Sequence, residues 1–524
     1  MKKRILSIVL AGLLLAGVFA ACVPAERQPA APTGQTPPTG TPTPPPRGTI
    51  ERGLTVGIQL ETGTIVPGRH SSMTAGHKNS LTHNGLFRPH YYDLSPVEDI
   101  VASWAAISDT IFEFTIHEGI MFHNGVEMTA YDVVASLEYV RQFPYARAAH
   151  GSVAGAEVVD RYTLRIDTGE PNAMLFFDLA HTGNMIMPGA LIDEGFDFSI
   201  NPIGSGPFVF HDWRFGDSLT FTRFDNYFDE ERAAHLEYVV WRIIPEGSSR
   251  TIALETGEID YIVEVPFPDI PRLEASPDIT VFQRPGVRLE FMALNNDLPM
   301  FQNVYVRRAI DMAIDREAEV IASVDGWGIP IFESVPMVLP GASGEGSRSF
   351  DPEGARALLE EQGIDPSTIT FEMLAFNEEG RRRGEVIQSN LADIGIHTTI
   401  GMMDLAAFLA ITSTMDYEAA FSSFTSSNLM SYFLGLMHEN SIDGQNRARM
   451  RNPELTSLID QAIATIDAPA RMAVLEEASR VANEHAGYIP LHLSIMVRAF
   501  NSNLVAPEIS ASGLMYLNMA FWAE

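Results

Sequence analysis

The sequence predicts an α/β protein whose folded part is divided into two or three lobes. A strand, a helix and a second strand follow one another over 369–403, which is the pattern of a βαβ unit with parallel strands. An earlier segment, 111–141, passes from an alternating strand into an amphipathic helix. About 475 residues follow the N-terminal segments, and one hydrophobic core seldom serves so long a chain.

Residues 1–21 have the pattern of an export signal. A short basic stretch precedes an apolar run over 5–18, which is too short to span a bilayer. The motif that ends at Cys22 resembles the lipobox of bacterial lipoproteins, with Phe19 where Leu is usual. The sequence therefore predicts a signal peptide over 1–21 and lipidation of Cys22, which would anchor the mature chain outside the cytoplasmic membrane, in a periplasm or at the cell surface. The alternative is a plain secretory signal with an incidental cysteine.

The segment 22–49 is predicted to be a linker. After Cys22 it consists almost entirely of Pro, Thr, Gly, Ala and Gln, so it cannot bury a core. Proline-rich chain favours extended polyproline II at roughly 3 Å per residue, which gives a reach of up to about 80 Å. We expect it to act as a spacer between the anchor and the folded body.

Composition excludes several classes of function. Cys22 is the single cysteine, so no intrachain disulfide can form. Loss of three basic residues with the signal peptide changes the formal net charge from −32 to −35, and so acidic a chain is not expected to bind nucleic acid. Lys78 is the only lysine of the mature chain, which removes most candidates for Schiff-base chemistry. No later apolar run approaches the roughly 20 residues that cross a bilayer.

The first strand and helix of the body have clear local signals. Apolar and polar residues alternate over 111–117, which predicts a strand with one buried face. Asn124-Gly125 predicts a tight turn. Thr129, followed by Asp132 three residues later, forms a capping box at the start of a helix.

The second half of the chain contains the βαβ unit. Asp351-Pro352 begins a helix that ends at Gly363. A strand over 369–375 and a helix that ends at Gly395 follow, and 396–403 is the next strand. Ligands of parallel α/β sheets bind beyond the carboxyl ends of the strands, so we expect a binding site at that edge.

A series of motifs in a fixed order carries a resemblance to a known family. The motifs are Ser108-Asp109, Phe112-Glu-Phe-Thr115, His117-Glu-Gly119, Met121-Phe-His-Asn-Gly125, Thr129-Ala-Tyr-Asp-Val133, Gly204-Ser-Gly-Pro-Phe208, Asn226-Tyr-Phe228, Gly257-Glu-Ile-Asp260, Val306-Arg-Arg-Ala-Ile310 and Ala313-Ile-Asp-Arg316. This series resembles the family 5 extracellular solute-binding proteins of ABC transporters, the relatives of dipeptide-, oligopeptide- and nickel-binding proteins. The resemblance covers nearly all of 54–500 and implies the lipoprotein form of the family.

The resemblance implies a two-lobed periplasmic-binding-protein-like fold of class II, with an extra subdomain inserted in lobe one. The expected boundaries are 50–293 for lobe one, about 85–195 for its inserted subdomain, 294–495 for lobe two and 496–524 for a return to lobe one. The segments 286–294 and 496–500 flank the block that holds the βαβ unit and are expected to be the crossing strands.

The function implied by the resemblance is capture of a solute, a peptide or peptide-like molecule, between the two lobes. Binding closes the lobes, and the closed form would deliver the solute to the permease subunits of an ABC importer. The resemblance implies a monomer with no cofactor and no catalytic residues. A hydrolase is the alternative of another class, but the chain has no Gly-x-Ser-x-Gly elbow and no His-Glu-x-x-His motif.

The solute is less well defined. In peptide-binding relatives a Trp-x-x-Asp-Tyr-Pro stretch supplies a carboxylate that pairs with the α-ammonium of the peptide. The corresponding stretch here, 422–428, contains no acid. We expect the last five residues of this stretch to line the ligand site: Phe424, Thr425, Ser426, Ser427 and Asn428. Phe424 falls at the place of the Trp and Ser427 at that of the Asp. Small hydroxyl and amide groups suit an oligosaccharide, another neutral polar solute, or a blocked peptide. A polar loop without a binding role is the alternative.

Nickel is a further alternative because four histidines crowd the start of the fold. They are His70, His77, His83 and His90. Their spacing is irregular and matches no short ligand pattern, so no metal site is expected among them.

Overall fold

The computed structural model describes residues 52–523 with short gaps at 62, 70–72, 144–149, 345–347, 443 and 507–508. The predicted signal peptide over 1–21, the lipidated Cys22 and the linker over 22–49 therefore lie outside the described residues. The described residues belong to one compact unit. In the part of the chain that is described, no helix is both long enough and apolar enough to cross a membrane.

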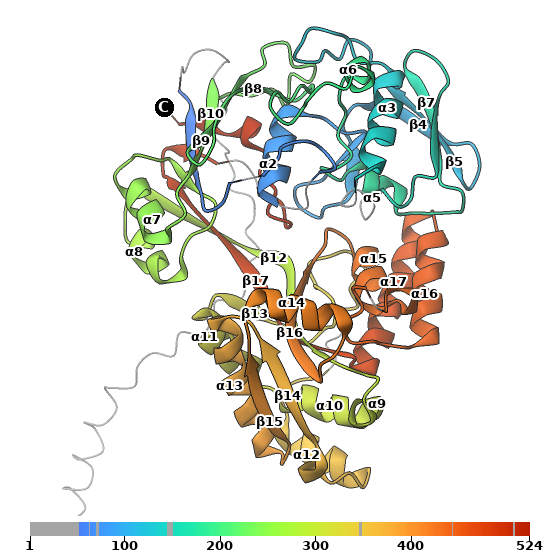
Figure 1. Cartoon of the computed structure of the whole chain (residues 1–524), viewed down its shortest axis with the longest axis vertical. Helices are drawn as coiled ribbons and strands as arrows, with labels where there is room; N and C mark the ends of the chain where they lie inside the picture. The colour runs from blue at the N-terminus through green and yellow to red at the C-terminus, as the bar shows by residue number, and fades with distance from the viewer. Residues whose placement is uncertain are drawn as a thin grey trace, which may run out of the picture. The chain divides into compact units, whose positions relative to one another are not determined.

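One long mixed sheet runs through both lobes (Figure 1). Its strand order is β15-β14-β16-β12-β17-β11-β1-β10-β9-β8, and β13 pairs with β17 off this path. The strands that belong to lobe one are β1 (Leu54–Ile58), β8 (Phe208–Arg214), β9 (Ser218–Arg223), β10 (Tyr238–Ile243) and β11 (Tyr261–Ile262). Those of lobe two are β13 (Gly328–Pro330), β14 (Thr370–Ala375), β15 (His397–Met402) and β16 (Ala419–Thr425). The two-lobed α/β fold is thus confirmed.

Two long strands connect the lobes. They are β12 (Ile279–Leu294) and β17 (Tyr488–Asn501), which pair antiparallel over most of their length. Their register breaks between Pro285 and Leu289. Both strands include a segment that the sequence predicted to cross between the lobes, and each extends further than predicted.

Lobe one carries a second sheet of four strands in the order β4-β5-β7-β6. These strands are β4 (Val101–Ala106), β5 (Ile111–Ile116), β6 (Gly155–Val158) and β7 (Thr163–Asp167). Lobe one also contains β2 (Phe87–Pro89), β3 (Pro96–Glu98), β18 (Leu504–Val505), β19 (Phe521–Trp522), α2 (Met73–Thr82), α3 (Ala130–Arg141), α5 (Leu175–Leu179), α6 (Gly189–Asp193), α7 (Gly247–Glu255) and α8 (Ile270–Glu274). The four-stranded sheet has its own core, in which Phe112, Phe114 and Leu164 are fully buried. It forms the inserted subdomain.

The capping box predicted for α3 is present. The Thr129 N–H donates to Asp132 Oδ2 at 2.8 Å, and the helix begins at the next residue. Asp132 Oδ1 also accepts a hydrogen bond of 2.7 Å from the Gly189 N–H. One carboxylate therefore caps α3 and ties it to the start of α6.

Lobe two contains the predicted βαβ unit. The α-helices described in lobe two are α9 (Pro299–Gln302), α10 (Val304–Ala313), α11 (Arg316–Val324), α12 (Pro352–Glu361), α13 (Glu378–Asp393), α14 (Leu405–Thr414), α15 (Leu429–Tyr432), α16 (Pro453–Ala464) and α17 (Ala468–His485). Strands β14 and β15 are parallel, and α13 is their crossover. Asp351 Oδ1 accepts from the Gly354 N–H at 2.8 Å at the start of α12, and Gly363, with φ +64°, follows its end.

A buried charge network fixes three elements of lobe two. Glu319 of α11 is fully buried, and its Oε1 accepts from Arg383 Nε of α13 at 2.8 Å. Its Oε2 lies 2.9 Å from His492 Nδ1 of β17. Removing one member of such a network is costly because it leaves a buried charge without a partner.

The lobes touch where the inserted subdomain meets the C-terminal helices. The Ala173 N–H donates to the carbonyl oxygen of Ile463 at 2.7 Å. Met174 is buried in the same hydrophobic cluster as Tyr432 of lobe two, and Ile466 packs against the core of the inserted subdomain. Backbone and side-chain contacts therefore both link the lobes at this place.

Candidate functional site

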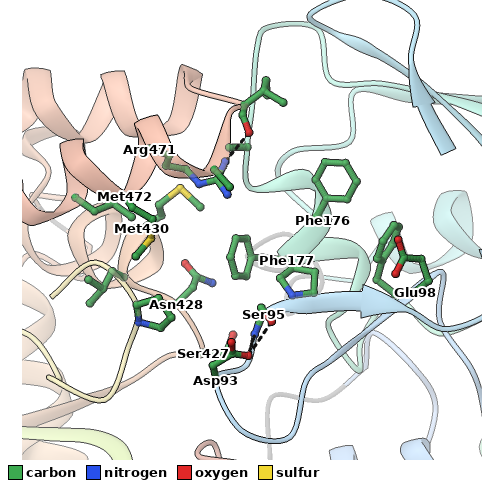
Figure 2. Close-up of a pocket in the computed structure, with 18 of the residues that line it drawn as sticks. Asp93, Ser95, Glu98, Phe176, Phe177, Ser427, Asn428, Met430, Arg471 and Met472 are labelled. Carbon is green, nitrogen blue, oxygen red and sulfur yellow. Dashed lines mark hydrogen bonds between the residues drawn. The ribbon is translucent and has the colours of Figure 1, made fainter.

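A cavity of about 440 Å³ lies between the inserted subdomain and lobe two (Figure 2). Lobe one contributes Phe87, Asp93, Ser95, Pro96, Glu98, Trp104, Ala173, Phe176 and Phe177 to its lining. Lobe two contributes Pro340, Ser427, Asn428, Leu429, Met430, Ile466, Ala468, Arg471, Met472 and Leu475. The volume falls within the roughly 300–1,000 Å³ that is usual for sites that hold small molecules.

Aromatic and methionine side chains make the cavity largely apolar. Phe176 and Phe177 are neighbours on α5, and the Phe176 ring lies 4.7 Å from that of Trp104 and 5.3 Å from that of Phe87. Met430 of α15 and Met472 of α17 face them from lobe two (Figure 2). Rigid aromatic rings on one side and flexible thioethers on the other suit a bulky apolar group of variable shape.

Asp93 supplies a carboxylate from lobe one. Its Oδ1 accepts from the Ser95 N–H at 3.1 Å and from Ser95 Oγ at 2.7 Å, and it lies 2.9 Å from His90 Nδ1. Among the described residues, Asp93 Oδ2 has no hydrogen-bond partner, and the side chain is 43% exposed. Partial burial raises the pKa of Asp93, but the hydrogen bonds from Ser95 and His90 outweigh it and hold the pKa below its ordinary value. The group is therefore ionised at neutral pH.

A second carboxylate, Glu98, lies on the same side of the cavity. Its Oε1 accepts from Trp104 Nε1 at 3.3 Å. Glu98 is at the end of β3 and Trp104 is on β4, so this bond ties the two strands together at the rim of the cavity. The contact also fixes the orientation of the Trp104 indole.

Among the described residues of the lining, Arg471 is the one basic side chain. Its Nη1 donates to the carbonyl oxygens of Thr465 and Ile466 at 3.0 and 2.9 Å, just after the end of α16. Within the described part of the chain, no carboxylate lies within ion-pair distance of Arg471. Burial lowers the pKa of Arg471, and the nearby Asp467 opposes that effect. The cavity thus has a guanidinium on the lobe-two side and two carboxylates on the lobe-one side.

The structure brings together two of the five residues that the sequence predicted for the ligand site. Ser427 and Asn428 line the cavity. Asn428 is 7% exposed, and its Oδ1 accepts from the Ser431 N–H at 2.9 Å at the start of α15. Among the described residues, Asn428 Nδ2 has no hydrogen-bond partner.

The other three residues of that stretch do not line the cavity. Phe424 packs its ring 5.1 Å from that of Tyr432, in the core of lobe two. Thr425 is exposed, and Ser426 is half-buried. A ligand-binding role stays a prediction for all five residues, and Ser427 and Asn428 are the two that the cavity lining includes.

A smaller cavity of about 200 Å³ lies beyond the carboxyl end of β14. Asn377, Arg288, Ser422 and Arg447 are among its lining residues, and Arg447 Nη1 donates to Ser422 Oγ. This is the edge of the sheet where the βαβ pattern predicted a ligand. The cavity lies within lobe two, because every residue in its lining belongs to that lobe or to β12.

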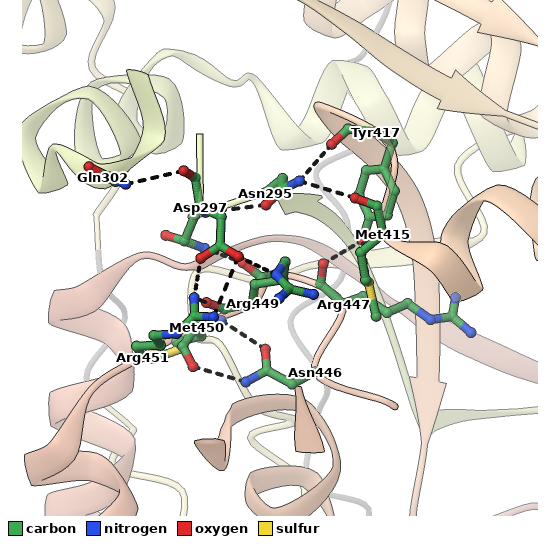
Figure 3. Close-up of polar contacts among 12 residues, drawn as sticks. Asn295, Asp297, Gln302, Met415, Tyr417, Asn446, Arg447, Arg449, Met450 and Arg451 are labelled. Carbon is green, nitrogen blue, oxygen red and sulfur yellow. Dashed lines mark hydrogen bonds and ion pairs between the residues drawn. The ribbon is translucent and has the colours of Figure 1, made fainter. Parts of the chain in front are cut away.

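Backbone contacts hold Arg447 at this cavity (Figure 3). The Tyr417 hydroxyl donates to the carbonyl oxygen of Arg447. Asn446 Oδ1 accepts from the Met450 N–H, and Asn446 Nδ2 donates to the Met450 carbonyl, both at 2.9 Å. Asp297 accepts from the arginines at 449 and 451. The turn that carries Arg447 is therefore fixed from both sides.

The histidines at the start of the fold have separate environments. His77 is buried and stacks on Trp241 with ring centroids 5.7 Å apart, and burial holds its pKa well below the ordinary value. His83 is buried against Thr82, and His90 pairs with Asp93. His70 lies outside the described residues. Within the described ranges, no three His, Cys, Asp or Glu side chains are grouped so that they could hold a metal ion.

Most residues of the site could not be predicted from the sequence. Asp93, Trp104 and Phe177 have no local motif that marks them as ligand contacts, and Arg471 follows an ordinary helix start. They come together only because the inserted subdomain packs against α16 and α17. These residues could be predicted only if that contact between the inserted subdomain and the two helices were already known.

Comparisons with known proteins agree on the family. The model of bacterial extracellular solute-binding proteins, family 5 middle, matches residues 95–442. The glutathione-binding protein GsiB of Salmonella paratyphi A is 25% identical over 428 residues, which cover 78% of this chain and 83% of that protein. Heme-binding protein A of Haemophilus influenzae is 25% identical over 441 residues, covering 77% and 79%.

Solved structures have the same fold. HbpA2 from Haemophilus parasuis superposes with a TM-score of 0.82 at 22% identity, over 90% of this chain and 100% of that one. The periplasmic binding protein DppA from Helicobacter pylori in complex with the peptide STSA gives 0.74 at 21% identity, over 90% and 98%. The family match covers more than half of the sequence, and the fold agrees with it. This chain therefore belongs to the family 5 bacterial extracellular solute-binding proteins, which serve ABC importers.

Proposed function

We propose that this chain captures a peptide or peptide-like solute in the 440 Å³ cavity and presents it to the permease subunits of an ABC importer. The observation that carries the proposal is that both lobes supply the cavity walls. A ligand that contacts both lobes is bound more tightly when they are together, and this differential affinity is what drives closure. The cavity is therefore placed where occupancy and lobe closure can be coupled.

The chemistry of the lining favours a peptide-like solute over an oligosaccharide. Phe176, Phe177, Met430 and Met472 offer apolar surface, whereas the hydroxyl-rich surface of an oligosaccharide needs many hydrogen-bond partners. Asp93 and Arg471 supply one charge of each sign, which suits a molecule with both an ammonium and a carboxylate. Similar proteins bind glutathione or hold the peptide STSA, which is consistent with this choice.

The same proposal includes the membrane anchor and the monomeric state. The support for the anchor is the sequence 1–22, in which an export signal ends at the single cysteine. The predicted linker would let the folded body reach a permease while acylated Cys22 stays in the bilayer. The relatives are solute-binding proteins, so we propose binding without catalysis, with transport energy supplied by partner subunits.

A thermal-shift screen of the purified protein tests the class of solute. The panel contains di- to pentapeptides, their blocked forms, oligosaccharides and nickel. A ligand at a hundred times its dissociation constant adds about 2.7 kcal/mol to the free energy of unfolding, which gives a clear rise in Tm. Stabilisation by peptides or blocked peptides supports the proposal. Stabilisation by oligosaccharides or nickel alone would assign the chain to another branch of the family.

A further inference from the structure

We propose that Asp93 of lobe one binds the ammonium group of the solute, and that the aromatic side chains of Phe177 and Trp104 bind an adjacent apolar side chain of the solute. This inference rests on the proposed function and names the chemistry of its ligand: a peptide with a free amino terminus on a bulky apolar residue. The stretch 422–428 contains no acid, and the two carboxylates of the cavity lining, Asp93 and Glu98, both come from lobe one.

Asp93 has the position that such an anchor requires. It lines the same cavity as Ser427, and Figure 2 shows the two side chains close together at one end of it. The acid comes from lobe one, and Ser427 lines the same cavity from lobe two. An ammonium held there would join the lobes, because its ligand would contact Ser427 as well.

The carboxylate of Asp93 is held in place with one oxygen left over. Three donors, from Ser95 and His90, converge on Oδ1. Among the described residues, nothing bonds to Oδ2. Because Asp93 is already held in place, little conformational entropy is lost when its Oδ2 binds a ligand. A charge-assisted hydrogen bond to an ammonium is also about twice as strong as a hydrogen bond between neutral groups.

The charge of the lining also favours a cation near lobe one. Asp93 and Glu98 contribute two negative charges, and Arg471 contributes one positive charge. Figure 2 shows Arg471 on the opposite side of the cavity from Asp93. A buried ammonium without a carboxylate is strongly disfavoured, so the ammonium of a ligand is directed to the lobe-one end.

Neighbouring groups match the rest of an N-terminal residue. Asn428 is nine-tenths buried, and its Nδ2 donor is without a partner among the described residues, so it can donate to a peptide carbonyl. Phe177 and Trp104 lie on the lobe-one side and can pack against the first side chain. Ammonium, carbonyl and apolar side chain are the three features of an apolar N-terminal residue.

The test is a titration of three peptides against three forms of the full protein. The three peptides are forms of one sequence that begins with Phe and is selected from the thermal-shift panel. The first has a free N-terminus, the second is N-acetylated, and the third is N-acetylated and carries an internal lysine. The proteins are wild type, Asp93→Asn and the control Asp109→Asn. Asn keeps an Oδ1 acceptor for Ser95 and replaces the free Oδ2 by an amide. Asp109 is exposed and lies outside the cavity lining, so its change removes the same charge elsewhere.

We expect acetylation to weaken binding to wild type and to Asp109→Asn by roughly tenfold or more, and to have little effect on Asp93→Asn. Equal binding of free and acetylated peptides by wild type would overturn the inference, as would an Asp93→Asn variant that still discriminates between them. Recovery by the internal lysine would support the carboxylate anchor and show that a side-chain cation can use it. If no peptide in any form binds wild type, the proposed function itself is wrong. Circular dichroism and Tm establish that each variant is folded.

Discussion

The backbone N–H of Ala173 in the inserted subdomain donates a hydrogen bond of 2.7 Å to the carbonyl oxygen of Ile463 in lobe two. Beside it, Met174 is 9% exposed and belongs to the hydrophobic cluster of lobe two. Both contacts are made between protein groups of the two lobes. The lobes therefore have an interface of their own, next to the cavity that they enclose.

The Met174 contact gives a prediction about affinity. Met174 is not itself a lining residue, and Met174→Ala removes apolar area between the lobes. Closure should become less favourable, so that the solute binds about tenfold more weakly, as isothermal titration would show. The control is Met187→Ala, which removes the same side chain from a core within lobe one. It should lower Tm and leave affinity unchanged. Equal affinities for Met174→Ala and wild type would mean that this interface does not take part in closure.

Because Lys78 is buried, we expect the free energy of unfolding to depend on pH in an unusual way. Its side chain is fully buried, its Nζ donates to the Thr74 carbonyl at 3.2 Å, and it lies 4.8 Å from the centroid of the Trp241 ring. Burial lowers the pKa of Lys78 to about 7, although Glu61 opposes the shift. The folded state therefore binds fewer protons than the unfolded state between pH 7 and about 10.5, and stability should rise with pH through that window.

Replacing Lys78 by Met tests this sign. The substitution should raise the free energy of unfolding at pH 6–7, by something on the order of 1–3 kcal/mol, because no charge is then buried. The gain should shrink to nothing by about pH 10.5. Urea unfolding at several pH values measures it. A gain that is the same at pH 6 and pH 10 would show that packing, and not protonation, accounts for the effect.

The buried carboxylate of Glu319 should make the free energy of unfolding depend on pH at the acid end of the range. Burial raises its pKa, but the hydrogen bond with His492 and the Arg383 guanidinium outweigh it and hold the pKa at about 2. The stabilisation is therefore fully present above pH 4.5 and is lost as the pH falls toward 2. Glu319→Gln should cost about 3–5 kcal/mol at pH 7 and flatten this acid limb.

The matched control for that variant is Glu385→Gln, on the exposed face of α13. Glu385 pairs with Arg381 and its side chain is 55% exposed, so the change should have little effect on unfolding. If both substitutions lowered stability alike, the buried network could not be the cause.

Lipidation of Cys22 can be tested in cells. In the full chain, Cys22→Ser removes the only thiol, so the exported protein should move from the membrane fraction to the soluble fraction. Immunoblots of fractionated cells, with the wild-type chain alongside, provide the measurement. A Cys22→Ser protein that stays with the membrane to the same extent would leave a different anchor to be found.

Elements with local signals could be predicted from the sequence. The capping box of Thr129 and Asp132 fixed the start of α3, and Asp351 with Gly363 bounded α12. Each signal acts within a few residues, because a cap or a left-handed glycine is a local requirement. The βαβ unit followed from periodicity for the same reason.

Features that depend on distant contacts could not be predicted in this way. Gly204 and Gly206 stand in one of the motifs that carry the family resemblance, and neither has a positive φ. A Cβ on Gly204 would lie 2.1 Å from the Thr82 carbonyl oxygen, and one on Gly206 would lie 2.5 Å from that of Leu81. Glycine is required there because the loop lies directly against the end of α2. The site is a similar case, since Asp93 and Arg471 meet the same cavity from segments far apart in the sequence.

Binding of the solute in the cavity between the inserted subdomain and lobe two can be measured by isothermal titration of Ala468→Trp and Ala470→Trp. Both alanines are exposed at the start of α17, but only Ala468 lines the cavity. We expect Ala468→Trp to abolish binding of the peptide selected by the screen and Ala470→Trp to bind it like wild type. Unchanged binding by Ala468→Trp would place the solute elsewhere and rule out this cavity as its site.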